Sequence, residues 1–472
     1  MKFVYLFLML LCAPVALADG LPDLGDPAQT ALTPQDERRI GEEIMRDVNN
    51  SNDVISDVEV VDYLQGLGYR LASNSGDLPQ KFTFFVVNDP SINAFALPGS
   101  IIGVNSGLIT AVDNESELAS VVSHEIGHVV QHHIARMMAK QKQNAWQSFA
   151  AMAFALLAAR SNPQLAGGTM EAAAAGSIQQ QLDYTREHER EADRVGLQIL
   201  DSAGFDTRAM PAFFEKLMKG TRFSEGIAPS FLRTHPLTTE RIADTRNRAE
   251  QTPYRQVADS AGFNFARARI RAITGNANHA VEWFQSVLKE KRYVDEASQH
   301  YGYAVALVRA NKLADARAEI AWLRDHAPRN PMTESLAANL LMATGDMGQA
   351  ETRYKQGLAA YPNYRGLIYG YADLLLATNQ PDAMLKLIAD KQQAYPDDAH
   401  LYELKSQAYT RQGKQLLRHQ AQGEAYFRQY DLRGAIEQME LATRSPDGDF
   451  YQKSSVEARL KQLRAMLDEP SR

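Results

Sequence analysis

Two histidines and a glutamate stand at a spacing that suits metal chemistry. They lie in the segment His124-Glu125-Ile126-Gly127-His128, which has the pattern H-E-x-x-H. Residues four apart share one face of a helix, so His124 and His128 can bind one zinc ion together. Glu125 lies beside that face, where its carboxylate can take a proton from a metal-bound water. The pattern predicts a zinc metalloendopeptidase with one Zn²⁺ per chain.

A catalytic zinc needs a third protein ligand and keeps one position for water. His132 continues the same face, but eight residues of helix carry it about 12 Å from His124, too far to share an ion. A turn after His128 would shorten that distance, yet the glycine expected there is missing and Val129 to Gln131 favour continued helix. We therefore interpret His132 and His133 as solvated helix residues.

A second source of ligands is the acidic run at residues 187–193. Such runs usually form solvated faces. However, Glu189 and Asp193 stand four apart, and Leu197 and Leu200 continue that side as apolar positions. One carboxylate could bind the metal while the other orients a ligand histidine. The spacing favours Glu189 as the metal ligand.

Both groups require helices around a small sheet. Helical spacing covers residues 33–72, 115–138 and 183–203, whereas residues 81–87 and 100–104 are rich in strand formers. Residues 140–180 are rich in Ala and Gln. The apolar runs within this segment are too short to span a membrane. The segment is expected to form a helical hairpin or a partly mobile insertion, or else a lid or hydrophobic contact surface over a neighbouring site.

The second half of the chain repeats with a period of 34 residues. Prolines recur at positions 328, 362 and 396, and turn-forming residues recur midway between them, at Asn311, Gly345, Asn379 and Gly413. A period of 34 is the tetratricopeptide length, with two helices and a tight turn per unit. Residues 262–467 are thus expected to form a solenoid, capped by an irregular pair at 415–427 and 432–442.

The first residues have the character of a secretory signal. Lys2 precedes an apolar run at residues 3–15, and small residues lead to a predicted cleavage after Ala18. The run is shorter than a membrane anchor. The only cysteine, Cys12, lies within it, which suits an oxidising compartment such as the periplasm. The net charge of −7 excludes nucleic acid as an expected partner.

The motifs together resemble those of the M48 zinc metallopeptidases. The match rests on residues 124–128, on Glu189 to Asp193 as the E-x-x-A-D element, and on residues 93–99, with the sequence NAFALPG. The resemblance covers the protease half. It implies a mainly α protein, with a gluzincin-type α+β metalloprotease domain at residues 19–255 before the α-solenoid of repeats. It also implies Glu189 as the third ligand and Asp193 as its supporting partner.

Further residues and partners are implied by the same resemblance. Asn93, Ala94 and Phe95 are expected at the strand edge that holds substrate. His235 either stabilises the oxyanion with Arg241 nearby, or occupies the water position of zinc and restrains the enzyme. With its signal and repeats, the chain resembles exported family members that help outer-membrane β-barrel proteins assemble and degrade stalled ones, docking on the assembly machinery through the repeats without an integral membrane segment. The alternative is a chaperone or adaptor with a gated or weak protease site.

Overall fold

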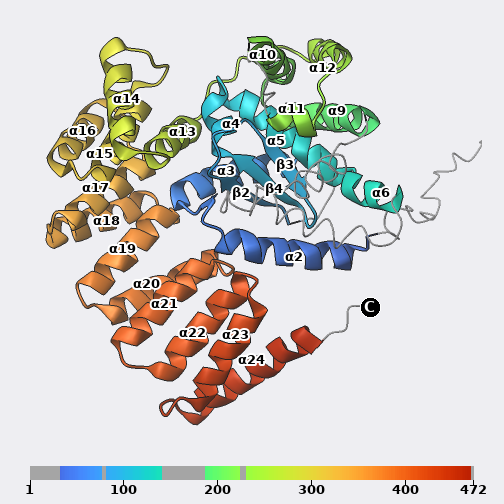
Figure 1. Cartoon of the computed structure of the whole chain (residues 1–472). Coiled ribbons are helices and arrows are strands. Elements are labelled where there is room, and N and C mark those ends of the chain that lie inside the picture. Colours follow the sequence, from blue (N-terminus) through green and yellow to red (C-terminus); the bar gives the residue numbers. More distant parts are fainter. Residues whose placement is uncertain (1–31, 77–80, 141–185, 224–229, 469–472) are drawn as a thin grey trace, which may run out of the picture.

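The computed structural model describes residues 32–76, 81–140, 186–223 and 230–468. The signal predicted at residues 1–18 and nearly all of the insertion predicted at residues 140–180 lie outside the described residues. Figure 1 shows a helical part with a small sheet, coloured blue to green, and a curved stack of helix pairs, yellow to red, that lies along it. The mainly α fold, with an α+β part followed by helical repeats, is as predicted.

The described residues begin with two helices rather than the one helix predicted for residues 33–72. Helix α2(Pro34–Asn50) starts at the N-cap Thr33, whose hydroxyl accepts from the Asp36 amide at 3.1 Å. A two-residue strand, β1(Val54–Ile55), then pairs with the sheet before α3(Val58–Ala72) begins. The apolar spacing continues through this break, because both helices bury their apolar faces.

The sheet has four strands in the order β1-β2-β4-β3. Strands β2(Thr83–Val87) and β4(Ile101–Asn105) are parallel, and β3(Ala94–Leu97) runs antiparallel to β4 at the edge. The Asn105 amide donates to the Asn93 carbonyl at 3.0 Å. Since hydrogen-bonded pairs alternate along an antiparallel ladder, the backbone groups of Ala94 and Ala96 point away from β4, toward the open edge.

The long helix predicted for residues 115–138 is also divided in two. After the short α4(Ser106–Ala111), helix α5(Glu115–Val130) ends at Gln131, and His132 takes a left-handed conformation with φ 50° before α6(His133–Lys140). Glycine is the common residue at such a position, but histidine is among the side chains that tolerate it better than most. The prediction that the helix continues through Val129 to Gln131 is therefore wrong, because the turn forms without a glycine.

Helices α5 and α9(Arg186–Ser202) cross at close range. A Cβ on Gly127 would lie 2.9 Å from the Ala192 carbonyl oxygen, and one on Gly196 would lie 3.0 Å from the His124 amide nitrogen. Each helix thus presents a glycine where the other backbone approaches. The crossing places residues 124 and 128 directly opposite the acidic side of α9. Helices α10(Ala209–Phe223), α11(Ser230–Thr234) and α12(Thr239–Gln251) complete this part.

The C-terminal part consists of helix pairs with the predicted period. Its four predicted turn residues, at positions 311, 345, 379 and 413, all have positive φ, between 56° and 83°. The prolines follow two residues after the helices that end at positions 326, 360 and 394. The helices are α13(Ala261–Ile273), α14(Ala277–Glu290), α15(Glu296–Arg309), α16(Leu313–His326), α17(Pro331–Ala343), α18(Met347–Ala360), α19(Arg365–Ala377), α20(Pro381–Ala394), α21(Ala399–Arg411), α22(Gln415–Arg428), α23(Leu432–Arg444) and α24(Phe450–Asp468).

The two parts share a core instead of being joined by a free linker. Phe263 and Ile270 of α13 are fully buried in the core of the α+β part, whereas Phe265 on another side of the helix packs with the first repeats. Ion pairs from Arg269 to Asp57 and from Arg365 to Asp62 also join the repeats to the first turns of α3. Helix α3 is therefore held between the sheet and the inner side of the solenoid (Figure 1).

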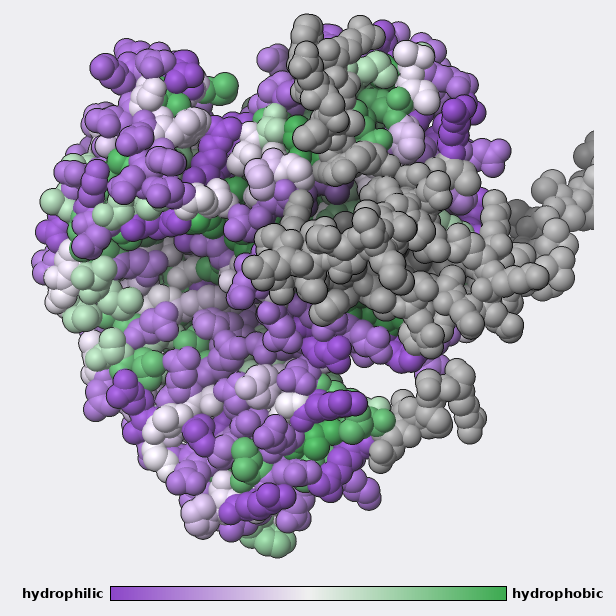
Figure 2. Space-filling view, viewed as in Figure 1, coloured by the Kyte–Doolittle hydropathy of each residue, from purple (hydrophilic) through white to green (hydrophobic). Residues whose placement is uncertain are grey.

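The outer surface of the described residues is mainly polar. Figure 2 shows one face, on which hydrophilic side chains predominate and apolar ones gather in small groups. One such group lies over α24, where Met466 and Leu467 are exposed. Among the residues that the structure describes, each helix is too short or too polar to span a bilayer.

Candidate metal centre

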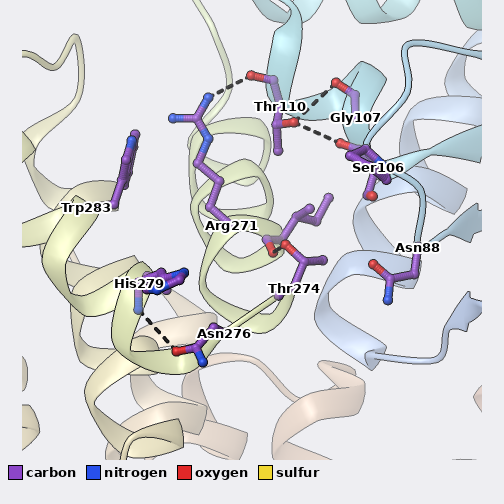
Figure 3. Close-up of a pocket in the computed structure, with 13 residues that line it drawn as sticks. Asn88, Ser106, Gly107, Thr110, Arg271, Thr274, Asn276, His279 and Trp283 are labelled. Carbon is purple, nitrogen blue, oxygen red and sulfur yellow. Dashed lines mark hydrogen bonds between the residues drawn. The ribbon is translucent and has the colours of Figure 1, made fainter.

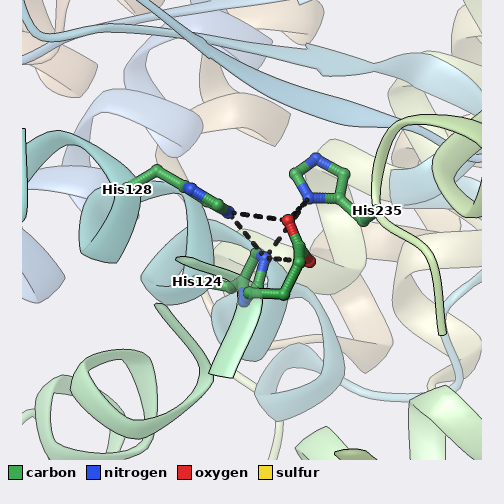
Figure 4. A group of neighbouring side chains, drawn as sticks. His124, His128 and His235 are labelled. Carbon is green, nitrogen blue, oxygen red and sulfur yellow. Dashed lines mark hydrogen bonds and ion pairs between the residues drawn. The ribbon is translucent and has the colours of Figure 1, made fainter. Parts of the chain in front are cut away.

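Four buried side chains from three segments converge on one point. Helix α5 supplies His124 and His128, α9 supplies Glu189, and the loop after α11 supplies His235. The Nε2 atoms of His124 and His128 are 3.0 Å apart, and the Glu189 carboxylate oxygens lie 3.6 and 3.5 Å from them. His235 Nδ1 closes the group, 3.4 Å from His124 Nε2 and 3.1 Å from Glu189 Oε1 (Figure 4).

These distances fit a zinc site. Donors held at about 2 Å from one ion in tetrahedral geometry stand about 3.3 Å from one another. Five contacts between donors of the group measure 3.0 to 3.6 Å, and all four donor atoms lie within 4.8 Å of one another. Imidazole nitrogens and a carboxylate oxygen are also the atoms that zinc prefers. The residues present therefore match zinc in both chemistry and spacing.

Asp193 and Arg241 support the group from behind. Asp193 Oδ1 lies 2.9 Å from His124 Nδ1, so it accepts the proton there and leaves Nε2 facing the centre. The Arg241 guanidinium contacts Asp193 at 2.7 Å and Glu189 at 2.6 Å. Because all three are buried, this arginine balances the two carboxylates inside the protein. Its partners are both on α9, so the arginine also fixes that helix relative to α12.

The charges around the centre favour a bound cation. Burial alone would raise the pKa of Glu189, but His235, His124 and Arg241 outweigh it and hold that pKa well below the usual range. Burial lowers the pKa of His124, yet Asp193 and Glu189 reverse the effect and raise it to about 10. The carboxylates of Glu189 and Asp193 are thus ionised. They favour a positive charge at His124, which a proton or a bound metal ion can supply.

His133 is a part of the centre, and the interpretation of it as a solvated residue is wrong. The turn at His132 brings its ring back, where it is fully buried with Nδ1 2.9 Å from His128 Nδ1. Its Nε2 lies 3.1 Å from Glu191, which also pairs with Arg136 at 2.8 Å. The sequence offered no signal for this contact, because it depends on the helix break and on α9 lying opposite.

The contacts define where the protons lie along the series Glu191, His133 and His128. Burial lowers the pKa of His133 to about 4 and that of His128 well below its usual range, so both rings are neutral. The Glu191 carboxylate accepts from His133 Nε2, which leaves His133 Nδ1 to accept from His128 Nδ1. His128 Nε2 then carries the lone pair toward the centre. Each histidine of α5 is thus oriented through Nδ1, one directly by Asp193 and the other through His133.

Replacing His133 with Ala should weaken zinc binding by about 10- to 100-fold, because His128 loses the partner that fixes its ring and tautomer. Competition with a chromophoric chelator measures this. Glu191→Ala should also weaken zinc binding. Because the Glu191 side chain is partly exposed, this substitution removes little packing, so the loss would report the contact with His133. His132→Asn, which keeps a side chain suited to the left-handed turn, is the matched control. Unchanged affinity in His133→Ala would show that His128 needs no such support.

Glu125 lies next to the group without belonging to it. Its carboxylate is fully buried, with Oε1 3.5 Å from His235 Nε2. Burial raises its pKa, while His235, His124 and the Ala96 amide of the edge strand pull it down. A buried carboxylate with a raised pKa beside a metal centre has the properties of a general base. It also connects the centre to strand β3.

The residues predicted to hold substrate lie on that edge. Ala94 and Phe95 are the first two residues of β3, and Asn93 precedes them. The ring of Phe95 packs edge-on against Phe85, with 6.0 Å between centroids, and its backbone groups face β4, so the open backbone groups at this edge are those of Ala94 and Ala96. Just before the strand, the Phe231 amide donates to the Ile92 carbonyl at 3.1 Å. The loop that carries His235 is therefore attached to the end of the same edge.

The fold and the centre define a zinc metallopeptidase with helical repeats. Two histidines of one helix and a glutamate of a crossing helix surround a common point, with the buried carboxylate of Glu125 alongside. Comparison with known proteins agrees. Residues 61–249 match the model of peptidase family M48, and residues 341–408 match a tetratricopeptide repeat model.

The chain belongs to peptidase family M48. It is 34% identical over 445 residues to the putative beta-barrel assembly-enhancing protease of Vibrio cholerae, covering 94% of this chain and 92% of that protein. The beta-barrel assembly-enhancing protease of Yersinia pestis is 31% identical, with 95% of this chain and 92% of that protein covered. Metalloprotease LoiP of Escherichia coli is 28% identical over 189 residues, which cover 39% of this chain and 69% of that protein.

Proposed function

We propose that the chain cuts polypeptides at a zinc centre held by His124, His128 and Glu189. The observation that carries this proposal is the convergence of their donor atoms within 3.6 Å of one another, beside the buried carboxylate of Glu125. When bound, zinc supplies a water of lowered pKa and polarises the peptide carbonyl. Glu125 takes the proton from the attacking water and passes it to the leaving amine.

The supporting residues have separate duties in this proposal. Asp193 orients His124 by accepting from its Nδ1, and Arg241 holds Asp193 and Glu189 in place. The open backbone groups of Ala94 and the carbonyl of Ala96 pair with an extended substrate, which needs no particular side chain. Because the Ala96 amide acts on Glu125, a paired peptide would lie along the face from which the base works.

His235 occupies the fourth position of the centre in this arrangement. Its Nδ1 faces His124 and Glu189, and its Nε2 lies 3.5 Å from Glu125, so the ring lies where the attacking water is needed. The ring also stacks on Phe231, with centroids 4.7 Å apart, within the short segment tied to the edge strand. Of the two roles considered from the sequence, the geometry favours restraint over oxyanion stabilisation. Release would require the loop after α11 to move.

Replacing His235 with Ala should therefore raise the rate of casein cleavage, because the water position becomes open without a loop movement. An increase of about tenfold corresponds to about 1.4 kcal/mol for displacing the ring. Zinc content, measured on the same samples, should stay at one ion per chain, because three ligands remain. His326→Ala, an exposed histidine of the repeats, serves as the control. A fall in cleavage with zinc retained would instead favour a direct catalytic duty for His235.

The relatives also suggest where the enzyme works and on what. Relatives covering nearly the whole chain are named for β-barrel assembly. We propose on this basis that the chain acts in the periplasm after cleavage of its signal, assists assembly of outer-membrane β-barrel proteins and degrades misassembled ones. The repeats would dock on the assembly machinery, since stacked helix pairs present extended surfaces for other proteins. A chaperone or adaptor with a restrained protease site is the alternative, and the position of His235 is compatible with it.

A further inference from the structure

A cavity of about 680 Å³ lies between the protease part and the first helix pair of the repeats. Helix α4 and the loop after β2 form one wall, and α13, α14 and the turn between them form the other (Figure 3). The polar and aromatic side chains that line it include Asn88, Thr110, Arg271, Asn276, His279 and Trp283. None of its lining residues belongs to the metal centre, so this is a separate site.

The ionisable side chains that line this cavity are all basic. The chain has an excess of acidic residues, yet the lining contains an arginine and a histidine and no Asp or Glu. Arg271 Nη2 donates to the Thr110 carbonyl at 2.7 Å, and its guanidinium lies 4.5 Å from the Trp283 ring centroid. Among the described residues, no carboxylate stands within ion-pair distance of Arg271. Burial and the neighbouring Arg267 lower its pKa to about 10, which is the response of a cation without an anion.

An anion in the cavity would remove this imbalance. A half-buried guanidinium is costly without a counter-charge, and its planar fork suits a carboxylate. The Trp283 side chain, 37% exposed, offers an apolar surface beside the charge. The volume exceeds what a single small ion would fill and is large enough for the end of a peptide. Polypeptides are also the class of molecule that a peptidase meets.

We propose that this cavity binds the free C-terminal carboxylate of a polypeptide, with Arg271 pairing the carboxylate and Trp283 contacting the last side chain. A chain end is the source we favour, because the charge and the apolar surface adjoin, as the carboxylate and side chain of a terminal residue do. Since the site lies between α4 and α14, an occupied cavity would also add a contact between the protease part and the repeats. The proposal does not depend on hydrolysis.

Fluorescence anisotropy tests this with three labelled hexapeptides, identical except that one has a free C-terminal Phe, one is amidated, and one is amidated with an internal Glu. Full-length Glu125→Gln protein serves as the binder, so that the probes are not cut. The free acid should bind at least about tenfold more tightly than either amide, the difference expected for one charge-assisted pair. Equal binding of acid and amide would overturn the proposal. Tight binding of the internal Glu peptide would overturn the chain end as the source.

Variants locate the binding site. Arg271→Gln should abolish the preference for the free acid, Arg271→Lys should keep part of it, and Trp283→Ala should weaken the acid and the amide alike. Arg309→Gln is the matched control, because Arg309 donates to the carbonyls of Ala272 and Gly275 on the same helix pair without lining the cavity. Circular dichroism identifies any variant that fails to fold, and Arg271→Lys then decides. A folded Arg271→Gln or Arg271→Lys protein with the full acid preference would contradict the assignment.

Discussion

The Glu125→Gln variant should keep its fold and its zinc but cleave casein at least about a hundredfold more slowly than the wild type, the usual range for loss of a general base. Glutamine has nearly the same shape, and it places no charge in a fully buried position, so the thermal midpoint should not fall. None of the zinc ligands is changed. The loss therefore reports the proton transfer alone.

Three measurements on this variant separate the possible outcomes. Zinc content should remain one per chain, the thermal midpoint should match the wild type, and cleavage should be lost. Glu187→Gln, the same substitution at an exposed position of α9, should cleave normally. Persisting cleavage in a pure Glu125→Gln sample would mean that another group takes the proton.

The same variant separates the two duties proposed for the protein in cells. In Gram-negative cells that produce a slowly assembling β-barrel protein, the wild type should reduce the unassembled form by cleavage. Glu125→Gln should leave the unassembled form intact and still promote assembly, if the repeats do that work. A protease without the assembly role would show no benefit from the inactive variant.

Glu189→Gln should lose zinc as well as cleavage. The carboxylate is the one ligand that α9 contributes, and its oxygens face both histidines of α5 at 3.5 and 3.6 Å. The fall in affinity should exceed the roughly 10- to 100-fold that accompanies loss of a supporting residue, such as that expected for His133. Chelator competition measures it on the purified full chain.

The contrast between the two variants is the informative result. Glu125→Gln should be inactive with zinc bound, whereas Glu189→Gln should be inactive because zinc is lost. Asp193 still neutralises Arg241 in the second variant, so the fold should survive, and the thermal midpoint checks this. Zinc bound to Glu189→Gln as tightly as to the wild type would transfer the third ligand role to another residue, with His235 the nearest candidate.

The repeats and the helix of His124 could be predicted from the sequence because their signals are local. A turn between packed helices needs a residue that tolerates positive φ, and Asn and Gly recur at that place in each unit. The H-E-x-x-H spacing likewise depends only on the pitch of one helix. Such features follow from near neighbours in the chain.

The parts that could not be predicted depend on contacts between distant segments. The break after α2 follows from the two residues of β1 pairing with β2, which no periodicity reveals. His133 became part of the centre because His132 adopts a left-handed turn and Glu191 arrives from another helix. No local pattern indicated that Arg241 would bridge Asp193 and Glu189. These residues have little local pattern, although they surround the centre.

Crystals of the zinc-loaded chain, measured on either side of the zinc absorption edge, test the proposed centre most directly. A single strong anomalous peak should lie between His124, His128 and Glu189, with no second zinc peak of similar height in the chain. A peak elsewhere, or one that excludes Glu189 from its ligands, would contradict the assignment of the metal centre.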